Sequence, residues 1–181
     1  MPQFAVNSWC PSLAVVLGAA ARPVPEGPGY SVLLVLHVGA AFVSFGTLGL
    51  TGLQAFRARR GPDQPGALSL RRYFRPGVNW VGRLLYAVPV LGFALVADSD
   101  GAFAAADGWV VAGLLLWLAA AVVAEAVVWP GERRIQLLVS EQWDDPSSVG
   151  TLRLECRRVA AASAALAGVF VAAVVIMVGK P

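Results

Sequence analysis

Charged side chains are scarce in this sequence, and so are the residue types that carry most catalytic chemistry. Asp, Glu, Lys and Arg make up 14% of the 181 residues, whereas soluble domains carry about 25%. There is one histidine, His37, and there are two cysteines, Cys10 and Cys156. A structural zinc site takes four such ligands, so the sequence excludes a zinc-type cluster.

The chain also lacks the usual motifs of enzymes. It has no glycine-rich phosphate loop and no nucleophile elbow, and no general base is evident for Ser44, Ser163 or Cys156. We therefore expect no catalytic activity. The formal net charge of +3 does not indicate nucleic acid as a partner, because the cations cluster in short segments beside long apolar runs.

What the sequence has in abundance is apolar residues, which make up 57% of the chain with a mean hydropathy of +0.67. About 20 apolar residues suffice to cross a bilayer as a helix. The longest run, 30–56, exceeds this length without a formal charge and ends at Arg57, Arg59 and Arg60. We predict an all-α fold, a four-helix transmembrane bundle with spans at about 30–56, 78–97, 109–129 and 159–178.

The distribution of charge predicts the orientation. Most of the arginines fall between the first and second spans or between the third and fourth, whereas the loop 98–108 has aspartates and no Lys or Arg. The positive-inside rule then gives two arginine-rich cytoplasmic loops and both termini outside. Residues 1–29 form an N-terminal extension in which 12–21 is signal-like, although no Lys or Arg precedes it. A cleaved signal, an interfacial segment and a misassigned start are all compatible with this pattern. Residues 179–181 are an external tail.

Local signals add detail to the predicted spans. Pro89 cannot donate to the carbonyl of Leu85, so we expect a kink with that carbonyl bonded to a neighbouring helix or to water. Pro130 and Gly131 should stop the third span. Residues 132–143 read as a short amphipathic helix.

Two further signals flank the predicted spans. Asp145 followed by Pro146 reads as the start of the last helix. The segment 68–74 mixes apolar residues with arginines, and we expect it to lie in the headgroup layer with its aromatics toward the lipid.

Two charged residues, Arg83 and Glu125, fall inside predicted spans, in the same half of the bilayer on antiparallel neighbours. A charge near the bilayer centre costs at least about 2.5 kcal/mol, so each should face the bundle and seek a partner. We predict an intramembrane ion pair. Its two interpretations are a structural pair that fixes helix register and a relay for protons or ions.

His37 is the candidate cofactor ligand, because a neutral imidazole can bind haem iron or copper. Met177 on the last span is a conceivable second axial ligand, although methionine near a helix end is more often packing. The alternative is a structural histidine hydrogen-bonded to a neighbour such as Trp117. The sequence assigns no cofactor firmly, with haem b and copper as the options.

The last span is rich in small residues. Ala164, Gly168 and Ala172 recur every fourth position, which gives a small-xxx-small face that lets another helix approach closely. The partner helix can belong to the bundle, where Gly39 and Gly46 would receive it, or to another subunit.

The run Leu36-His37-Val38-Gly39-Ala40-Ala41 resembles a family of small predicted bacterial integral membrane proteins of unknown function, which is loosely similar to the copper-resistance D family. These proteins show a Leu-His-Val start and a Trp-Val-Gly-Gly centre, and here the centre is Ser44-Phe45-Gly46-Thr47 instead. The resemblance implies a four-span architecture. The copper-resistance relatives and a similar haem-pathway oxidase imply copper or haem, through further ligands that this chain lacks.

The function we expect is that of a non-catalytic structural or accessory subunit in a bacterial cytoplasmic membrane. Its cytoplasmic face would bind through Arg71, Arg72, Arg133 and Arg134. Anionic lipid headgroups, a partner membrane subunit and a second copy of the chain are the expected partners. The alternatives are a haem- or copper-binding protein that uses His37 and a small proton- or ion-coupled transporter that uses Arg83 and Glu125.

Overall fold

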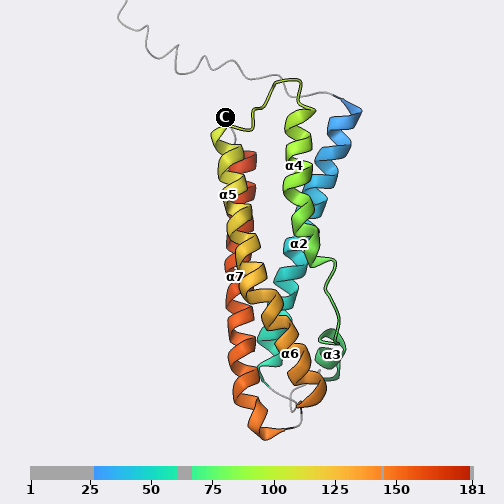
Figure 1. The fold of residues 1–181 in the computed structure, drawn as a ribbon, viewed down its shortest axis with the longest axis vertical. Helices are drawn as coiled ribbons and strands as arrows, with labels where there is room; N and C mark the ends of the chain where they lie inside the picture. The colour runs from blue at the N-terminus through green and yellow to red at the C-terminus, as the bar shows by residue number, and fades with distance from the viewer. Residues whose placement is uncertain (1–26, 61–66, 144, 180–181) are drawn as a thin grey trace, which may run out of the picture.

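The computed structural model describes residues 27–60, 67–143 and 145–179, and these residues form helices and connecting turns without strands (Figure 1). The signal-like stretch 12–21, Cys10 and the last two residues lie outside the described part. Three helices are long and apolar enough to cross a membrane, Pro28–Ala58, Gly108–Glu141 and Pro146–Val178, and Gly82–Ala97 is a shorter apolar helix. The predicted all-α class is confirmed for the described residues, and three of the four predicted spans lie in helices long enough to cross a membrane. The count of four spans stays a prediction.

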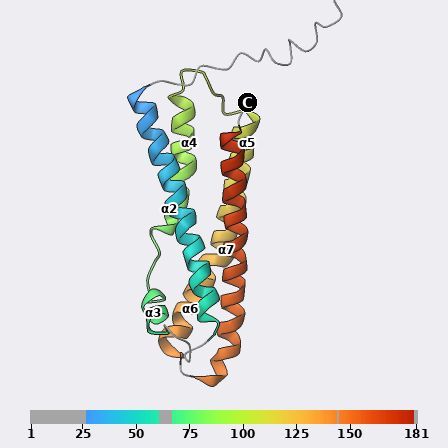
Figure 2. The same ribbon diagram turned by 180° about the vertical axis from the view of Figure 1, so that it is seen from behind.

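The helices form an elongated bundle. α2 (Pro28–Ala58) packs against α7 (Val149–Val178), α4 (Ala87–Ala97) lies against α2, and α5 (Gly108–Val123) lies against α7 (Figures 1 and 2). We call the end where α2 ends and α7 begins the arginine-rich end. The opposite end holds the turn between α4 and α5.

Two glycines explain how closely the long helices pack. A Cβ at Gly52 of α2 would overlap the Ser163 side chain of α7, and a Cβ at Gly131 would overlap Val159. The two positions therefore need glycine for space. Gly39 and Gly46, which we expected to receive the last span, have nothing within 4 Å of an added Cβ, so that expectation is wrong.

The second apolar segment is shorter than predicted. Regular α-helix begins at Ala87, after a 3₁₀ turn, η1 (Gly82–Tyr86), and residues 75–81 run without regular helix along the bundle (Figure 1). The Leu85 carbonyl, which Pro89 leaves without its helical donor, accepts a hydrogen bond from Trp117 Nε1 at 2.9 Å. The predicted rescue by a neighbouring helix is confirmed.

The prediction that the third apolar helix stops at Pro130 and Gly131 is wrong. α5 continues through a π-helical turn, η2 (Ala124–Val128), into α6 (Trp129–Glu141), giving one helix of 34 residues. The widened turn accommodates Pro130, which has no N–H to donate. The amphipathic character predicted for 132–143 is confirmed, because Ile135 and Val139 are buried.

The last helix begins as predicted. Asp145 precedes a 3₁₀ turn, η3 (Pro146–Ser148), and its side chain accepts from the Ser147 backbone N–H at 2.9 Å and from the Ser147 hydroxyl at 2.7 Å. These bonds satisfy donors that a helix start leaves free. α7 then runs without interruption to Val178.

The short helix α3 (Ala67–Tyr73) corrects the prediction of a lipid-facing segment. Leu70 and Phe74 are buried in the protein core, and the Tyr73 hydroxyl shares a 2.8 Å hydrogen bond with Thr51 of α2. Leu68 remains exposed. The aromatics of this segment pack against protein, and they belong to the same hydrophobic core cluster as the buried residues of the long helices.

Candidate functional site

One face of the long helix carries Glu125, Trp129, Glu132 and Gln136, which follow each other at steps of four, three and four residues. Regular spacing places Trp129, Glu132 and Gln136 on one side of α6, and Glu125, in the π-helical turn η2, contacts the same neighbouring segment. Each interacts with a group in the segment 77–86, which runs beside the helix in the opposite direction. We call this set of contacts the polar stripe.

The contacts of the polar stripe farther from the arginine-rich end involve Arg83 and Glu125, the predicted ion pair. The Tyr86 hydroxyl donates to the Glu125 carboxylate, and the Arg83 guanidinium lies 4.6 Å from the centre of the Trp129 ring. Arg83 and Glu125 are therefore in one cluster, but the salt bridges among the described residues do not include them. The direct ion pair is replaced by a tyrosine–carboxylate bond and a cation–π contact.

The contacts nearer the arginine-rich end were not predicted. Asn79 accepts a hydrogen bond from the Gly82 N–H at 3.1 Å, and its side chain is also bonded to the buried Glu132. The Gly77 N–H donates to Gln136 Oε1 at 3.4 Å. Gln136 thus supplies a partner for the Gly77 N–H, which lies outside any helix, and Asn79 supplies one for the Gly82 N–H at the start of η1. The spacing of the four stripe residues was visible in the sequence, but their partners were not.

The polar stripe does not continue across the bundle. Beyond Glu125, α5 and α4 carry no ionisable side chain. Glu125 itself is exposed on the side of the bundle, as is Tyr86. The arrangement therefore leaves a carboxylate at the protein surface, and it does not form a chain of proton carriers through the described helices.

His37 occupies a separate place between α2 and α4. Its Nδ1–H donates to the Val88 carbonyl at 2.9 Å, and its ring lies over Gly92, where an added Cβ would come within 3.2 Å of Cε1. Trp117 is thus not its partner. Met177 packs against Gly113 of α5, so its sulfur belongs to the α5–α7 contact. The described residues contain no group of three or more His, Cys, Asp or Glu that could hold a metal ion.

The small-residue face of α7 lies on the outside of the bundle. Ala164, Gly168 and Ala172 are exposed, and nothing approaches within 4 Å of a Cβ added at Gly168. The face that α7 turns inward is a different one, with Cys156, Val159, Ser163 and Leu166 buried. The sequence left open whether a helix of the bundle or of another subunit packs on this face, and no helix of the described bundle does so.

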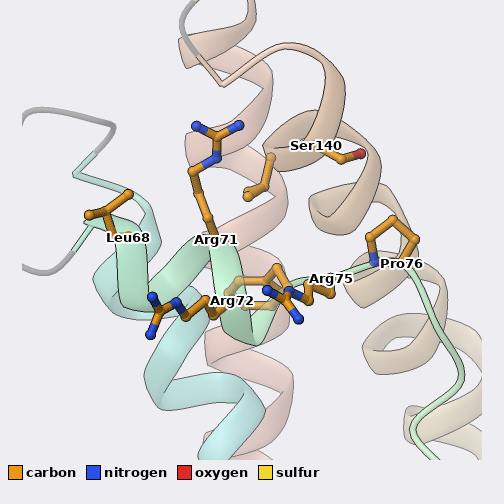
Figure 3. A pocket seen from close by; sticks show the side chains of 8 residues that line it. Leu68, Arg71, Arg72, Arg75, Pro76 and Ser140 are labelled. Atoms are coloured by element: carbon orange, nitrogen blue, oxygen red, sulfur yellow. The ribbon is translucent and has the colours of Figure 1, made fainter.

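The arginines that we expected to bind partners are exposed. Arg134 contacts Glu155 at 3.2 Å, and Glu155 also lies 3.6 Å from Arg158. Arg71, Arg72 and Arg75 surround a hollow of about 320 Å³ between α3 and α6, but Figure 3 shows Arg71 extending away from the other two. These side chains form a broad positive surface whose groups do not converge.

The comparison with protein families agrees with this architecture. The family described as predicted integral membrane protein (DUF2269) matches residues 31–181, which is most of the chain. The chain belongs to this family. The DUF2269 match includes all four apolar helices and the His37 segment, and it confirms the resemblance noted in the sequence. No curated protein and no solved structure matches the chain.

Proposed function

We propose that the chain is a non-catalytic accessory subunit of a membrane protein complex. The observation that carries this proposal is the exposed position of the small-residue face of α7. In lipid, apolar helices gain little from burying apolar surface, so they associate where small residues let backbones come close. Ala164, Gly168 and Ala172 offer such a surface, and Gly168 is open.

The exposed carboxylate of Glu125 supports the same proposal. It is hydrogen-bonded to Tyr86 on one side only and lies on the surface of an apolar bundle. A carboxylate in such a place is stabilised by a donor or a cation on a neighbouring protein. A π-helical turn at this point also fits an interaction site, since π-bulges are frequent at functional positions.

The proposed topology is four spans in the bacterial cytoplasmic membrane with the arginine-rich end in the cytoplasm. The positions of the arginines support it, because α6, which carries Arg133 and Arg134, and the arginine-bearing start of α7 lie at the same end of the bundle as the last turn of α2, which carries Arg57 (Figure 1). The opposite end carries Asp98 and Asp100 in the turn after α4. Residues 78–81 would complete the short second span, since Val78, Trp80 and Val81 are exposed and apolar. Arg71, Arg72, Arg133 and Arg134 would then face cytoplasmic partners and anionic headgroups.

The test compares two leucine substitutions on α7. Gly168→Leu fills the small-residue face, whereas Ala167→Leu adds similar bulk at an exposed position about 100° around the same helix. An affinity-tagged full chain is purified from its native membrane in mild detergent, and protein that co-purifies in fixed ratio is measured. We expect wild type and Ala167→Leu to retain the partner, or a second copy of the chain, and Gly168→Leu to lose it. Equal retention by all three chains would refute this surface as the interface.

A haem- or metal-binding role for His37 is the second candidate. The bond from Nδ1–H to the Val88 carbonyl favours it, because a ligating imidazole characteristically donates its other nitrogen to a carbonyl and keeps Nε2 for the metal. Because the described residues form no group of three or more His, Cys, Asp or Glu, further metal ligands would have to come from outside the described part of the chain. The test is an absorption spectrum and metal analysis of purified wild type beside His37→Ala: a Soret band or stoichiometric copper that disappears in the variant supports the role, and neither in wild type rejects it.

A further inference from the structure

A second hollow lies at the arginine-rich end, between the end of α2 and the start of α7. Its volume is about 410 Å³, and the described residues that line it are Arg59, Arg60, Arg153 and Arg157. The antiparallel packing of α2 and α7 brings these residues together from distant parts of the sequence (Figure 2). We call it the four-arginine hollow.

The backbone that carries the four side chains is fixed. The Arg59 N–H donates to the Ala55 carbonyl at 3.1 Å, and the Arg60 N–H donates to the Arg57 carbonyl at 3.2 Å. Arg153 and Arg157 are four residues apart on α7, so they are neighbours on its surface. The described lining of this hollow consists of arginines alone, whereas apolar side chains and Ser140 share the lining of the hollow beside α3 in Figure 3.

The charges of this hollow are not balanced by the described protein. None of its arginines takes part in a salt bridge among the described residues, whereas Glu155, on the same helix, is engaged by Arg134 and Arg158. The positive charges of Arg153 and Arg157, four residues apart on one helix, repel each other. The described lining therefore favours an anion, and it holds no carboxylate that would compete with one.

The hollow lies where the apolar surface of α2 ends. Leu53 and Phe56 are exposed on the turns that precede Arg60, and the Arg59 guanidinium lies 3.8 Å from the centre of the Phe56 ring. Arginines that follow a long apolar helix are found at the level of the lipid headgroups. An anion at this place would have acyl chains beside Leu53 and Phe56 and its charged group against the guanidinium forks.

We propose that the four-arginine hollow binds the headgroup of an anionic phospholipid that carries two phosphodiester groups, as cardiolipin does. Each guanidinium presents paired N–H donors that match phosphate oxygens. Four of them can hold two phosphates, with one fork from each helix on each phosphate. This site is independent of the small-residue face of α7 and of any protein partner.

The test uses the purified, delipidated full chain in mild detergent, without a partner protein. Cardiolipin, phosphatidylglycerol, phosphatidylcholine and inorganic phosphate are titrated separately, and binding is followed by the rise in the unfolding midpoint. We expect cardiolipin to bind most tightly. Arg153→Gln/Arg157→Gln should weaken it by about 30-fold, if each arginine contributes about a fivefold factor near a charged surface. Arg71→Gln/Arg72→Gln removes the same charge from the separate hollow beside α3 and should weaken cardiolipin binding much less than the substitutions on α7 do.

Three results would overturn the proposal. Equal weakening by the two double variants would mean diffuse attraction to the whole basic surface. An effect of inorganic phosphate equal to that of cardiolipin, with the same arginine dependence, would make this a site for free phosphate. If cardiolipin binds no more tightly than phosphatidylglycerol, the hollow does not bind two phosphates of one headgroup. If the glutamine pair does not fold, Arg153→Lys/Arg157→Lys decides: it keeps the charge but loses the forks, and affinity equal to wild type contradicts the proposal.

Discussion

Gly52→Ala is the sharpest test of the packing between α2 and α7. The added methyl would overlap the Ser163 side chain, whose hydroxyl is buried without a hydrogen-bond partner. Inserting one methyl group into a well-packed contact costs about 1 to 3 kcal/mol. The substitution also gains about 0.5 to 1 kcal/mol, because alanine is the better helix former. The expected net effect is a loss of up to about 2.5 kcal/mol.

Gly49→Ala supplies the matched control on the same helix. Nothing lies within 4 Å of a Cβ at Gly49, so only the helix-propensity gain remains, and the variant should be more stable than wild type by about 0.5 to 1 kcal/mol. The two single-methyl variants should therefore change the free energy of unfolding in opposite directions. Their difference measures the packing cost alone, because the propensity gain is common to both.

The assay is reversible unfolding in mild detergent, with the midpoint followed by circular dichroism. A third variant, Gly52→Ala/Ser163→Gly, removes the atoms that the new methyl meets, together with the unpaired hydroxyl. We expect it to recover the packing loss, less about 1 kcal/mol for the new helical glycine. If Gly52→Ala is as stable as Gly49→Ala, α2 and α7 do not approach at this point and the packing described here is refuted.

Two further predictions concern polar contacts. Trp117→Phe removes the donor to the buried Leu85 carbonyl and should lower the free energy of unfolding by about 1 to 3 kcal/mol in the same assay. In a Pro89→Ala background, which restores a backbone donor, this loss should be smaller. An unchanged loss in that background would contradict the role of Trp117. Hydrogen bonds from the Ser147 hydroxyl, and secondly from its backbone N–H, hold the pKa of Asp145 below its usual range. The carboxylate therefore stabilises the start of α7 above about pH 4, and this stabilisation is lost as the pH falls through the lower folded-state pKa. Asp145→Asn should therefore have a lower unfolding midpoint than wild type at pH 6 and approach it below about pH 4, and a gap that widens on acidification would refute this sign.

Much of the fold follows from local features of the sequence. The length of the apolar runs predicts the membrane helices, because the backbone in lipid must satisfy its hydrogen bonds within the segment. Pro89 predicts a free carbonyl at Leu85, and Asp145 before Pro146 predicts a helix start. The last two conclusions depend on neighbours within four residues along the chain, and the first depends on the length of one continuous segment.

The errors concern the direction in which side chains point. The π-helical turn after Val123 changes the phase of every later residue on the long helix, so the partner of Glu125 cannot be read by extending a regular repeat. The apolar pattern of 68–74 was read correctly as amphipathic, but it does not distinguish lipid from a protein core as the apolar medium. The small residues of α7 likewise indicate close approach without naming the helix that approaches.

The unbroken helix from Gly108 to Glu141 has a mechanical consequence. Its 34 residues make a helix about 51 Å long, and the polar stripe connects its middle turns to residues 77–86. If such a helix tilted as one body by about 5° at one end, the other end would move by about 4 Å. A contact beside α5 that tilted the helix would therefore shift α6 and Arg133 and Arg134, which α6 carries.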